Sequence, residues 1–265
     1  MIKNSRITSV LNANFLDSTI TGFPTFQLPD LDLKSEVNFD LPSNLRLGHL
    51  AEKVVSELIN ASANFNVLYE NVQILEVKRT IGELDFIIEN NLNNDIIHLE
   101  VAYKFYLYDP SISIDPTRNW IGPNRNDSLV EKLEKLKSRQ FPLLQHPVLE
   151  SMLKNIEISK VKQALCFMHS LFIPFDFNGT LDPLYKPAIK GYYLSLDKFR
   201  SIDHSTKNYH LPKKIDWGID PKENSTWSSF DQIEKQISLS IGENQSALCW
   251  QKQGNLYSVF FIVWW

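Results

Sequence analysis

One stretch of the sequence, residues 81–108, combines acidic residues and a lysine with the pattern of two β-strands. β-Branched and aromatic residues alternate along its two halves, IGELDFIIE and IIHLEVAYKFYLY, and a polar run separates them. Successive side chains of a strand point to opposite faces. Asp85 therefore shares a face with Glu83, and Glu100 shares a face of the second strand with Lys104. Charged groups at such buried positions are costly unless they are paired or bind a metal.

The turn of this hairpin predicts its register. A symmetric turn centred between Leu92 and Asn93 pairs Asp85 with Glu100. Directly opposite residues lie about 4.5–5.5 Å apart at Cβ, so two carboxylates there repel each other unless a cation lies between them. Oxygen-rich sites of this kind suit Mg²⁺ or Mn²⁺. The sequence therefore predicts a divalent-cation site at this pair of acids.

A helix that begins near Ser43 or Asn44 is predicted to precede the hairpin. Its apolar stripe follows helical spacing and consists of Leu47, Leu50, Ala51, Val54 and Leu58, widened by Val55 and Ile59. Glu52 lies at the edge of this stripe. From the residues alone, two orientations of its carboxylate are equally favoured: toward Asp85 and Glu100, or into solvent.

A second helix is predicted over residues 128–141, where Ser128 and Glu131 fit a capping box. Its buried face consists of Leu129, Leu133 and Leu136. Gln140 projects from the middle of that face and Lys132 from its margin, so polar groups stand where apolar ones are expected. Both are therefore candidates for the acid site. The alternative for Lys132 is a solvated basic face.

These residues resemble the PD-(D/E)XK phosphodiesterase superfamily, the restriction-endonuclease-like nucleases, in which an Asp on one strand and a Glu-x-Lys on the next hold the metal. The resemblance is closer still to an uncharacterised bacterial family, a domain of unknown function grouped with that superfamily. Four stretches carry it: RLGHLAE (46–52), TIGELDF (80–86), HLEVAYKFYL (98–107) and GPNRNDSLVEKLEKLKSRQ (122–140). The sequence departs from the motif at Ala102, where a lysine is expected.

The resemblance implies a metal-dependent phosphodiesterase or nuclease that hydrolyses nucleic acid, DNA or RNA, with a metal-activated water. Asp85 and Glu100 would hold Mg²⁺ or Mn²⁺, with Glu52 as a further acid. Lys104, which lies on the face of Glu100, would replace the missing motif lysine by positioning the water or the phosphate. The superfamily often uses a glutamine or lysine of the second helix, which Gln140 and Lys132 match.

Two other functions stay open. Ala102 and the acidic net charge favour a catalytically inactive relative that binds nucleic acid or a protein partner. In a purely structural domain, the acids would instead pair with Arg79, Lys104 or Lys132.

Residues 109–127 form a long connection, rich in proline and asparagine, without the period of a helix or strand. Long irregular loops inside compact domains are often functional. This loop begins where the strand of Lys104 ends, so we expect it to lie over the carboxylates. It would then offer Arg118, Trp120 and Arg125 to a phosphate or a base of the substrate. A merely structural loop is the alternative.

The predicted order of elements is helix, three strands, helix and strand, the last being the apolar run at 162–173. This is the core of the restriction-endonuclease-like α/β fold, a mixed sheet flanked by helices. Prolines break residues 1–42, which we interpret as an N-terminal arm. Residues 43–175 are the predicted nuclease-like core, and residues 176–265 are a β-rich C-terminal extension packed on it.

Composition narrows the classes of function. A net charge of −4 gives no global attraction to phosphate backbones, so nucleic-acid binding needs a local basic surface. The two cysteines, Cys166 and Cys249, lack metal-ligand spacing and are predicted to be reduced core residues of a cytoplasmic protein. The longest apolar run, VFFIVWW, is far shorter than the roughly 20 residues of a membrane helix, and no signal peptide is evident. We therefore expect no membrane association.

Overall fold

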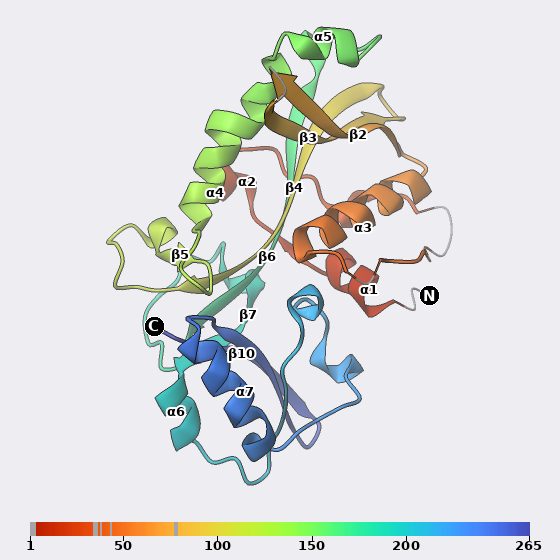
Figure 1. The fold of residues 1–265 in the computed structure, drawn as a ribbon. Coiled ribbons are helices and arrows are strands. Elements are labelled where there is room, and N and C mark those ends of the chain that lie inside the picture. Colours follow the sequence, from red (N-terminus) through yellow and green to blue (C-terminus); the bar gives the residue numbers. More distant parts are fainter. Residues whose placement is uncertain (1–3, 34–36, 38, 43, 77–78) are drawn as a thin grey trace. The chain divides into compact units, whose positions relative to one another are not determined.

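The computed structural model describes residues 4–33, 37, 39–42, 44–76 and 79–265. Within these ranges the chain forms an α/β structure whose sheet has 10 strands, parallel and antiparallel, flanked by helices (Figure 1). Eight strands follow the order β2-β3-β4-β6-β7-β10-β9-β8, while β1 pairs with β6 and β5 with β4. The predicted α/β class with a mixed sheet is confirmed. The restriction-endonuclease-like core stays a prediction.

The chain divides into two compact units. Unit 1 consists of Met1–Tyr103 and Glu131–Met168, and unit 2 of Lys104–Val130 and His169–Trp265. The N-terminal segment thus belongs to the same unit as the first strands of the predicted core. Because compactness alone does not define a domain, the predicted boundaries at residues 42 and 175 stay predictions.

The N-terminal segment of unit 1 forms short regular elements, where an irregular arm was predicted. They are α1 (Ser5–Leu11), β1 (Asn14–Phe15), α2 (Ser18–Thr21) and the 3-10 turn η1 (Leu28–Asp30). The side chain of Asn4 caps α1 by accepting from the backbone N–H of Arg6 (3.0 Å). The N–H of Leu16, just after β1, donates to the carbonyl of Phe167 on β6 (3.1 Å). Elements this short bury too few residues to produce a visible apolar period.

The first long helix of unit 1 is α3 (Leu47–Ala61), which buries the predicted apolar stripe. It begins later than expected, because Arg46 holds the N-cap position and Asn44 lies in a turn; Ser43 lies outside the described residues. α3 contacts β2 (Phe65–Glu76), where Ser56 donates to a Glu70 carboxylate oxygen (2.6 Å).

The central hairpin consists of β3 (Arg79–Asn90) and β4 (Asp95–Tyr108). Its antiparallel ladder runs from Asn90↔Asp95 to Phe86↔Leu99, which confirms the register predicted from the turn. The ladder ends at Phe86↔Leu99, and the next residue of each strand toward the open end is Asp85 and Glu100. β4 continues from unit 1 into unit 2.

The predicted second helix has two parts. α4 (Leu129–Lys135) is a regular α-helix, and η3 (Leu136–Gln140) is a π-helix whose wide turn closes when the N–H of Phe141 donates to the carbonyl of Leu136. Pro142 follows at once, and without an N–H it cannot continue an α-helical ladder. The chain then passes through η4 (Phe141–Gln145), α5 (Val148–Met152) and η5 (Ile158–Lys160) into β6 (Lys162–Pro174). β6 is buried along most of its length, as the apolar run predicted.

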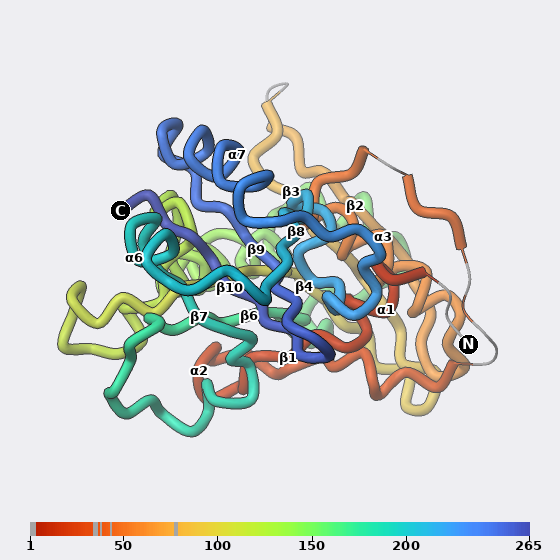
Figure 2. The backbone as a smooth tube through the Cα atoms, turned by 90° about the horizontal axis from the view of Figure 1, so that it is seen from below, coloured from red at the N-terminus to blue at the C-terminus, as the bar shows by residue number. Residues whose placement is uncertain are grey.

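Unit 2 is built on β7 (Ile189–Ser195), which pairs in parallel with β6 and with β10 (Leu256–Val263). β9 (Ala247–Gln253) and β10 form an antiparallel hairpin at the end of the β-rich C-terminal part, visible side by side in Figure 2. Gly191 is required on β7, because a Cβ there would lie 1.8 Å from the carbonyl oxygen of Val259. The other elements are η2 (Pro116–Asn119), β5 (Trp120–Ile121), η6 (Lys186–Ala188), α6 (Leu196–Ser201), β8 (Asn208–His210), η7 (Lys214–Asp216), η8 (Pro221–Glu223) and α7 (Phe230–Gly242).

Both cysteines, Cys166 and Cys249, are buried free thiols, as their apolar surroundings predicted. Burial raises the pKa of each thiol, so neither is an activated nucleophile. In the part of the chain that the structure describes, no helix has the length and apolar character needed to cross a bilayer.

Candidate functional site

The predicted acid pair lies in unit 1, where the ladder between β3 and β4 stops. The backbone N–H of Val101 donates to Asp85 Oδ2 (2.8 Å). The side chain of Asp85 thus supplies an acceptor to β4 next to the last ladder pair, Phe86↔Leu99. This bond fixes one oxygen of the Asp85 carboxylate beside the strand that carries Glu100.

Glu100 is fully buried, with 0 % of its surface exposed. Both carboxylate oxygens accept hydrogen bonds: Oε1 from Nε2 of His98 (2.9 Å) and Oε2 from Nε2 of Gln140 (2.5 Å). A buried carboxylate is strongly destabilising unless it is hydrogen-bonded or paired. The two donors therefore explain how the fold holds Glu100 in its interior.

A row of polar groups connects this carboxylate to the helix. Nζ of Lys132 donates to Oε1 of Gln140 (3.0 Å), and the Gln140 amide donates in turn to Glu100. Lys132 lies on α4 and Gln140 ends the π-helix. A π-helix turns less per residue than an α-helix, so η3 brings Gln140 closer to the line of Lys132 along the helix. π-Helical turns often occur at functional sites.

Glu52 of α3 belongs to the same electrostatic group. Burial raises the pKa of Glu52, the nearby His49 lowers it, and the Glu83 and Glu100 carboxylates raise it further. Nδ1 of His49 lies 3.3 Å from a Glu52 carboxylate oxygen. Of the two places open to Glu52, this influence of Glu83 and Glu100 supports the one toward the acids.

The pKa of Asp85 is raised to about 8. Burial is the largest cause, followed by the negative charge of Glu100; the N–H of Val101 opposes the shift, Glu52 adds to it, and Lys132 opposes it. Burial and like charges both disfavour an ionised carboxylate. Near neutral pH, Asp85 is therefore mostly protonated in the metal-free protein.

The donor atoms of this site suit a hard divalent cation. Carboxylate oxygens are the usual protein ligands of Mg²⁺, which keeps several waters and often takes only one or two carboxylates. Each Glu100 oxygen accepts one hydrogen bond and retains a further lone pair. Among the described residues, no three or more His, Cys, Asp or Glu side chains are arranged to hold a metal ion. The carboxylates are therefore suitable ligands for Mg²⁺ or Mn²⁺, but the described side chains alone do not complete the coordination of the metal.

Four of the predicted site residues belong to unit 2 and make their contacts there. Lys104, on β4, donates to Oδ2 of Asp127 (2.6 Å). Its amine is therefore engaged with a carboxylate of the connection at 109–127. Its role as the replacement for the missing motif lysine stays a prediction.

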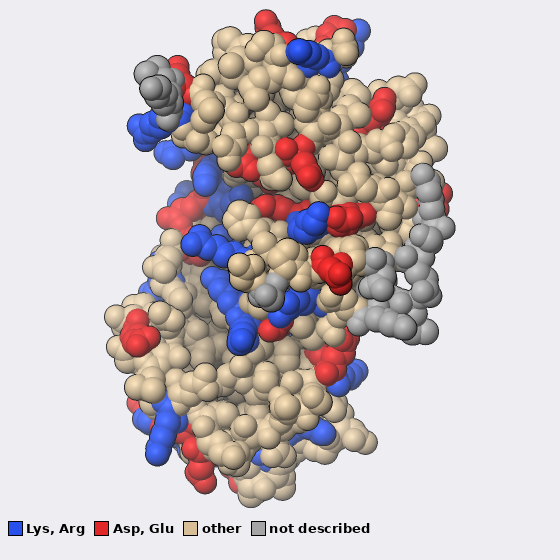
Figure 3. Space-filling view, turned by 45° about the vertical axis from the view of Figure 1, so that its right-hand side comes forward, with Lys and Arg blue, Asp and Glu red and all other residues tan. Residues whose placement is uncertain are grey.

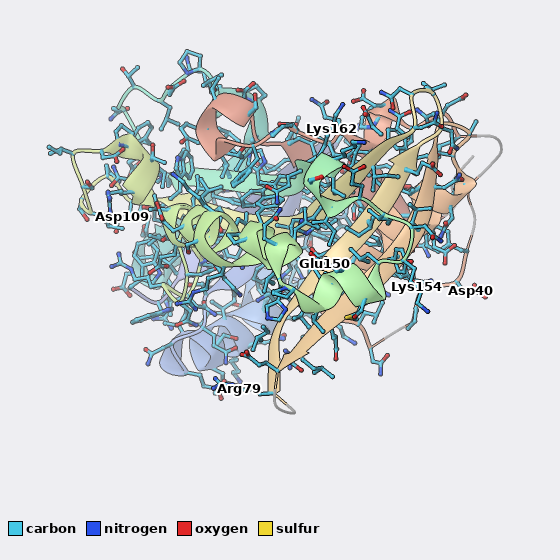
Figure 4. All side chains as sticks on the ribbon, turned by 90° about the horizontal axis from the view of Figure 1, so that it is seen from above. Asp40, Arg79, Asp109, Glu150, Lys154 and Lys162 are labelled. Carbon is cyan, nitrogen blue, oxygen red and sulfur yellow. The ribbon has the colours of Figure 1, made fainter. Side chains whose placement is uncertain are left out.

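The connection at 109–127 has more structure than the sequence indicated, because it contains η2 and β5. Arg125 has a left-handed backbone (φ 58°), pairs with Asp109 at 2.5 Å and lies over the ring of Trp265 at 3.9 Å (Figure 4 labels Asp109). Arg118 is mostly exposed and lies 3.6 Å from Asp115. Of the two arginines, Arg118 is the more accessible to a ligand.

The expectation that Trp120 offers its ring to a base is wrong. Trp120 is fully buried, and its ring contacts Tyr108 and Tyr185 at centroid distances of 4.9 and 5.1 Å. It pairs with Tyr108 as part of β5. Its size and apolar character place it in the core of unit 2, where no base can reach it.

The surface charge is mixed. The face drawn in Figure 3 carries both basic and acidic groups among a majority of other residues. This face therefore presents both signs of charge.

His98 is a site residue that the sequence analysis did not single out. It is fully buried, bonds Glu100 and meets the ring of Phe141 edge-on at a centroid distance of 5.3 Å. Strand alternation places it on the face of Glu100, two residues away. His98 could have been identified from the sequence, because a polar side chain is unusual in a strand that is buried on both faces.

Comparisons with curated proteins and with solved structures gave no significant match. A family model, in contrast, matches residues 27–252, a range that includes every residue of the acid site. The chain therefore belongs to the family described as Domain of unknown function (DUF1853).

Proposed function

We propose that the acid site of unit 1 is the centre of a metal-dependent phosphodiesterase that cleaves nucleic acid. One arrangement carries the proposal: the bond from the N–H of Val101 holds Asp85 beside the strand position of Glu100, a crowding of like charges in which Glu100 and Glu52 add to the raised pKa of Asp85. Such crowding is unfavourable by itself. A divalent cation between Asp85 and Glu100 would neutralise the repulsion between the carboxylates, and the carboxylates would in turn bind the cation.

In this proposal, Asp85 and Glu100 hold Mg²⁺ or Mn²⁺, and Glu52 is a further acid near the metal. A cation so bound lowers the pKa of a water and neutralises charge on the phosphate. The row Lys132–Gln140–Glu100 adds a positive charge and an amide on the helix side of the site. Lys132 would bind a phosphate oxygen, and Gln140 would orient both Lys132 and Glu100.

The resemblance to the PD-(D/E)XK superfamily supports the same function. It rests on TIGELDF and HLEVAYKFYL, which contribute Asp85 and Glu100, and on the helix that contributes Gln140. The hairpin ladder stops at Phe86↔Leu99, just before these acids, which is consistent with a cation between the two strands.

A second candidate is a nuclease-like module that binds nucleic acid or a protein without cleaving. Two observations favour it. Ala102 stands at the motif lysine, and the amine of Lys104 is bonded to Asp127. Without a free lysine amine, activation of the attacking water would depend on the metal and on Lys132.

The test compares the full chain with Asp85→Asn, which keeps the size and the acceptor oxygen of the side chain. An exposed acid on α7, changed as Asp231→Asn, is the matched control. We expect Mn²⁺ to raise the melting temperature of the wild type and of Asp231→Asn, but not of Asp85→Asn.

The same three proteins are then incubated with single- and double-stranded DNA and RNA in Mg²⁺ or Mn²⁺. Cleavage by the wild type and the control, lost in Asp85→Asn, supports the nuclease. Equal cleavage by Asp85→Asn contradicts it. Nucleic-acid binding without cleavage, and without a metal-dependent shift, favours the second candidate.

A further inference from the structure

The contacts of His98 are unusual for a buried histidine. Its side chain has 0 % exposure, and its Nε2 bonds Oε1 of Glu100 at 2.9 Å. The other ring nitrogen, Nδ1, is buried and has no hydrogen-bond partner among the residues described. The one hydrogen bond that the structure gives this imidazole is therefore directed at the acid site.

A packing role does not explain this arrangement. A buried polar atom without a partner is destabilising, and an apolar side chain of similar size would fill the same space without stranding a nitrogen. Phe141 contacts the ring edge-on, a contact that another ring could also make. What an apolar residue cannot supply is a donor to Glu100.

Glu100 receives its two donors on different oxygens. The terminal torsion of a glutamate is broad, so a carboxylate held at one oxygen still rotates. Here Nε2 of His98 holds Oε1 from β4, and Nε2 of Gln140 holds Oε2 from η3. Together these two bonds fix the plane of the carboxylate relative to both the strand and the helix.

We propose that His98 is a positioning residue, which together with Gln140 holds the Glu100 carboxylate in the orientation that binds a divalent cation. This inference rests on the proposed function, because it assigns His98 a role at the same metal. Groups that orient metal ligands typically contribute 10–100-fold to metal affinity. His98 would act entirely through Glu100 and would not contact the metal or the substrate.

Two variants test the role of the donor. In His98→Gln, the side-chain amide reaches about as far as Nε2, whereas in His98→Asn it ends near the position of Nδ1. The two differ by one methylene, and both bury an amide. We expect His98→Gln to bind Mn²⁺ as the wild type does, and His98→Asn to bind it about 10–100-fold more weakly. The readout is free Mn²⁺ measured by electron paramagnetic resonance, with the melting temperature of each metal-free variant as the check on folding.

The outcomes separate this inference from the proposed function. If the wild type binds Mn²⁺, Asp85→Asn does not, and His98→Asn binds as well as His98→Gln, the positioning role is overturned while the metal site stands. If the wild type binds no Mn²⁺, both proposals are overturned.

A measurement on the wild-type chain keeps the inference testable if His98→Asn does not fold. With ¹⁵N-labelled histidines, addition of Mg²⁺ is expected to shift the ring signals of His98. Unchanged His98 signals at saturating Mg²⁺ would contradict the role.

Discussion

Asp85→Asn is expected to stabilise the metal-free protein at high pH. The folded protein raises the pKa of Asp85 from 3.8 to about 8, above its value in the unfolded chain. Between these two pH values the folded state binds more protons than the unfolded state, so the free energy of unfolding falls as pH rises. At 1.36 kcal/mol per pKa unit, a shift of roughly four units corresponds to an upper limit of about 6 kcal/mol. The stabilisation that a protonated Asp85 gives is fully present below pH 4 and lost above pH 8.

Asparagine has no charge to bury, and its carbonyl oxygen can still accept the bond from Val101. Relative to the wild type, the variant should therefore gain free energy of unfolding as the pH rises, by several kcal/mol between pH 5 and pH 9. The assay is urea unfolding in EDTA at both pH values. Asp127→Asn is the control, because removing an acid that is paired with Lys104 should give no gain. A difference between the two proteins that is the same at both pH values, or Asp85→Asn less stable than the wild type at pH 9, would mean that the fold does not raise the pKa of Asp85.

Three further changes follow from the same contacts. Gln140→Leu removes the donor to Glu100 Oε2 and the acceptor of Lys132, so urea unfolding should show a loss of about 1–3 kcal/mol, and an unchanged stability would argue against the polar row. Trp120→Ala empties a buried site in unit 2 and should reduce the free energy of unfolding by about 3–5 kcal/mol, whereas a loss below 1 kcal/mol would mean that the ring is not in the core. Lys104→Met breaks a partly exposed ion pair and should change stability by no more than about 1 kcal/mol, while cleavage activity that disappears with it would show that this amine takes part in the reaction.

The hairpin could be predicted in detail because its information is local. The strand period fixes which face each side chain takes, and the polar turn fixes the register, so the structure pairs Ile87 with His98 as expected. The helices α3 and α4 followed from apolar spacing in the same way. Gln140 was found because a polar residue stood in an apolar face, and the structure places its amide on Glu100.

The remaining features depend on contacts between distant residues. Trp120 looked available because its loop lacks periodicity, but Tyr185 covers it from 65 positions further along. The partner of Lys104 is an aspartate in the next connection, which strand alternation cannot reveal. The π-helix follows α4 directly and places the amide of Gln140 on Glu100, 40 positions earlier in the chain, which the pattern of leucines does not mark. Each of these features depends on tertiary packing, which the spacing of apolar residues along the sequence does not predict.

Binding of a divalent cation by Asp85 and Glu100 can be measured by isothermal titration of the full chain with Mn²⁺ at pH 8. The wild type is compared with the double variant Asp85→Asn, Glu100→Gln, in which both carboxylates become uncharged amides of the same size. We expect saturable binding by the wild type and none by the double variant, while the double variant remains folded in its metal-free form. Equal binding by both proteins, or binding by neither, would contradict this expectation.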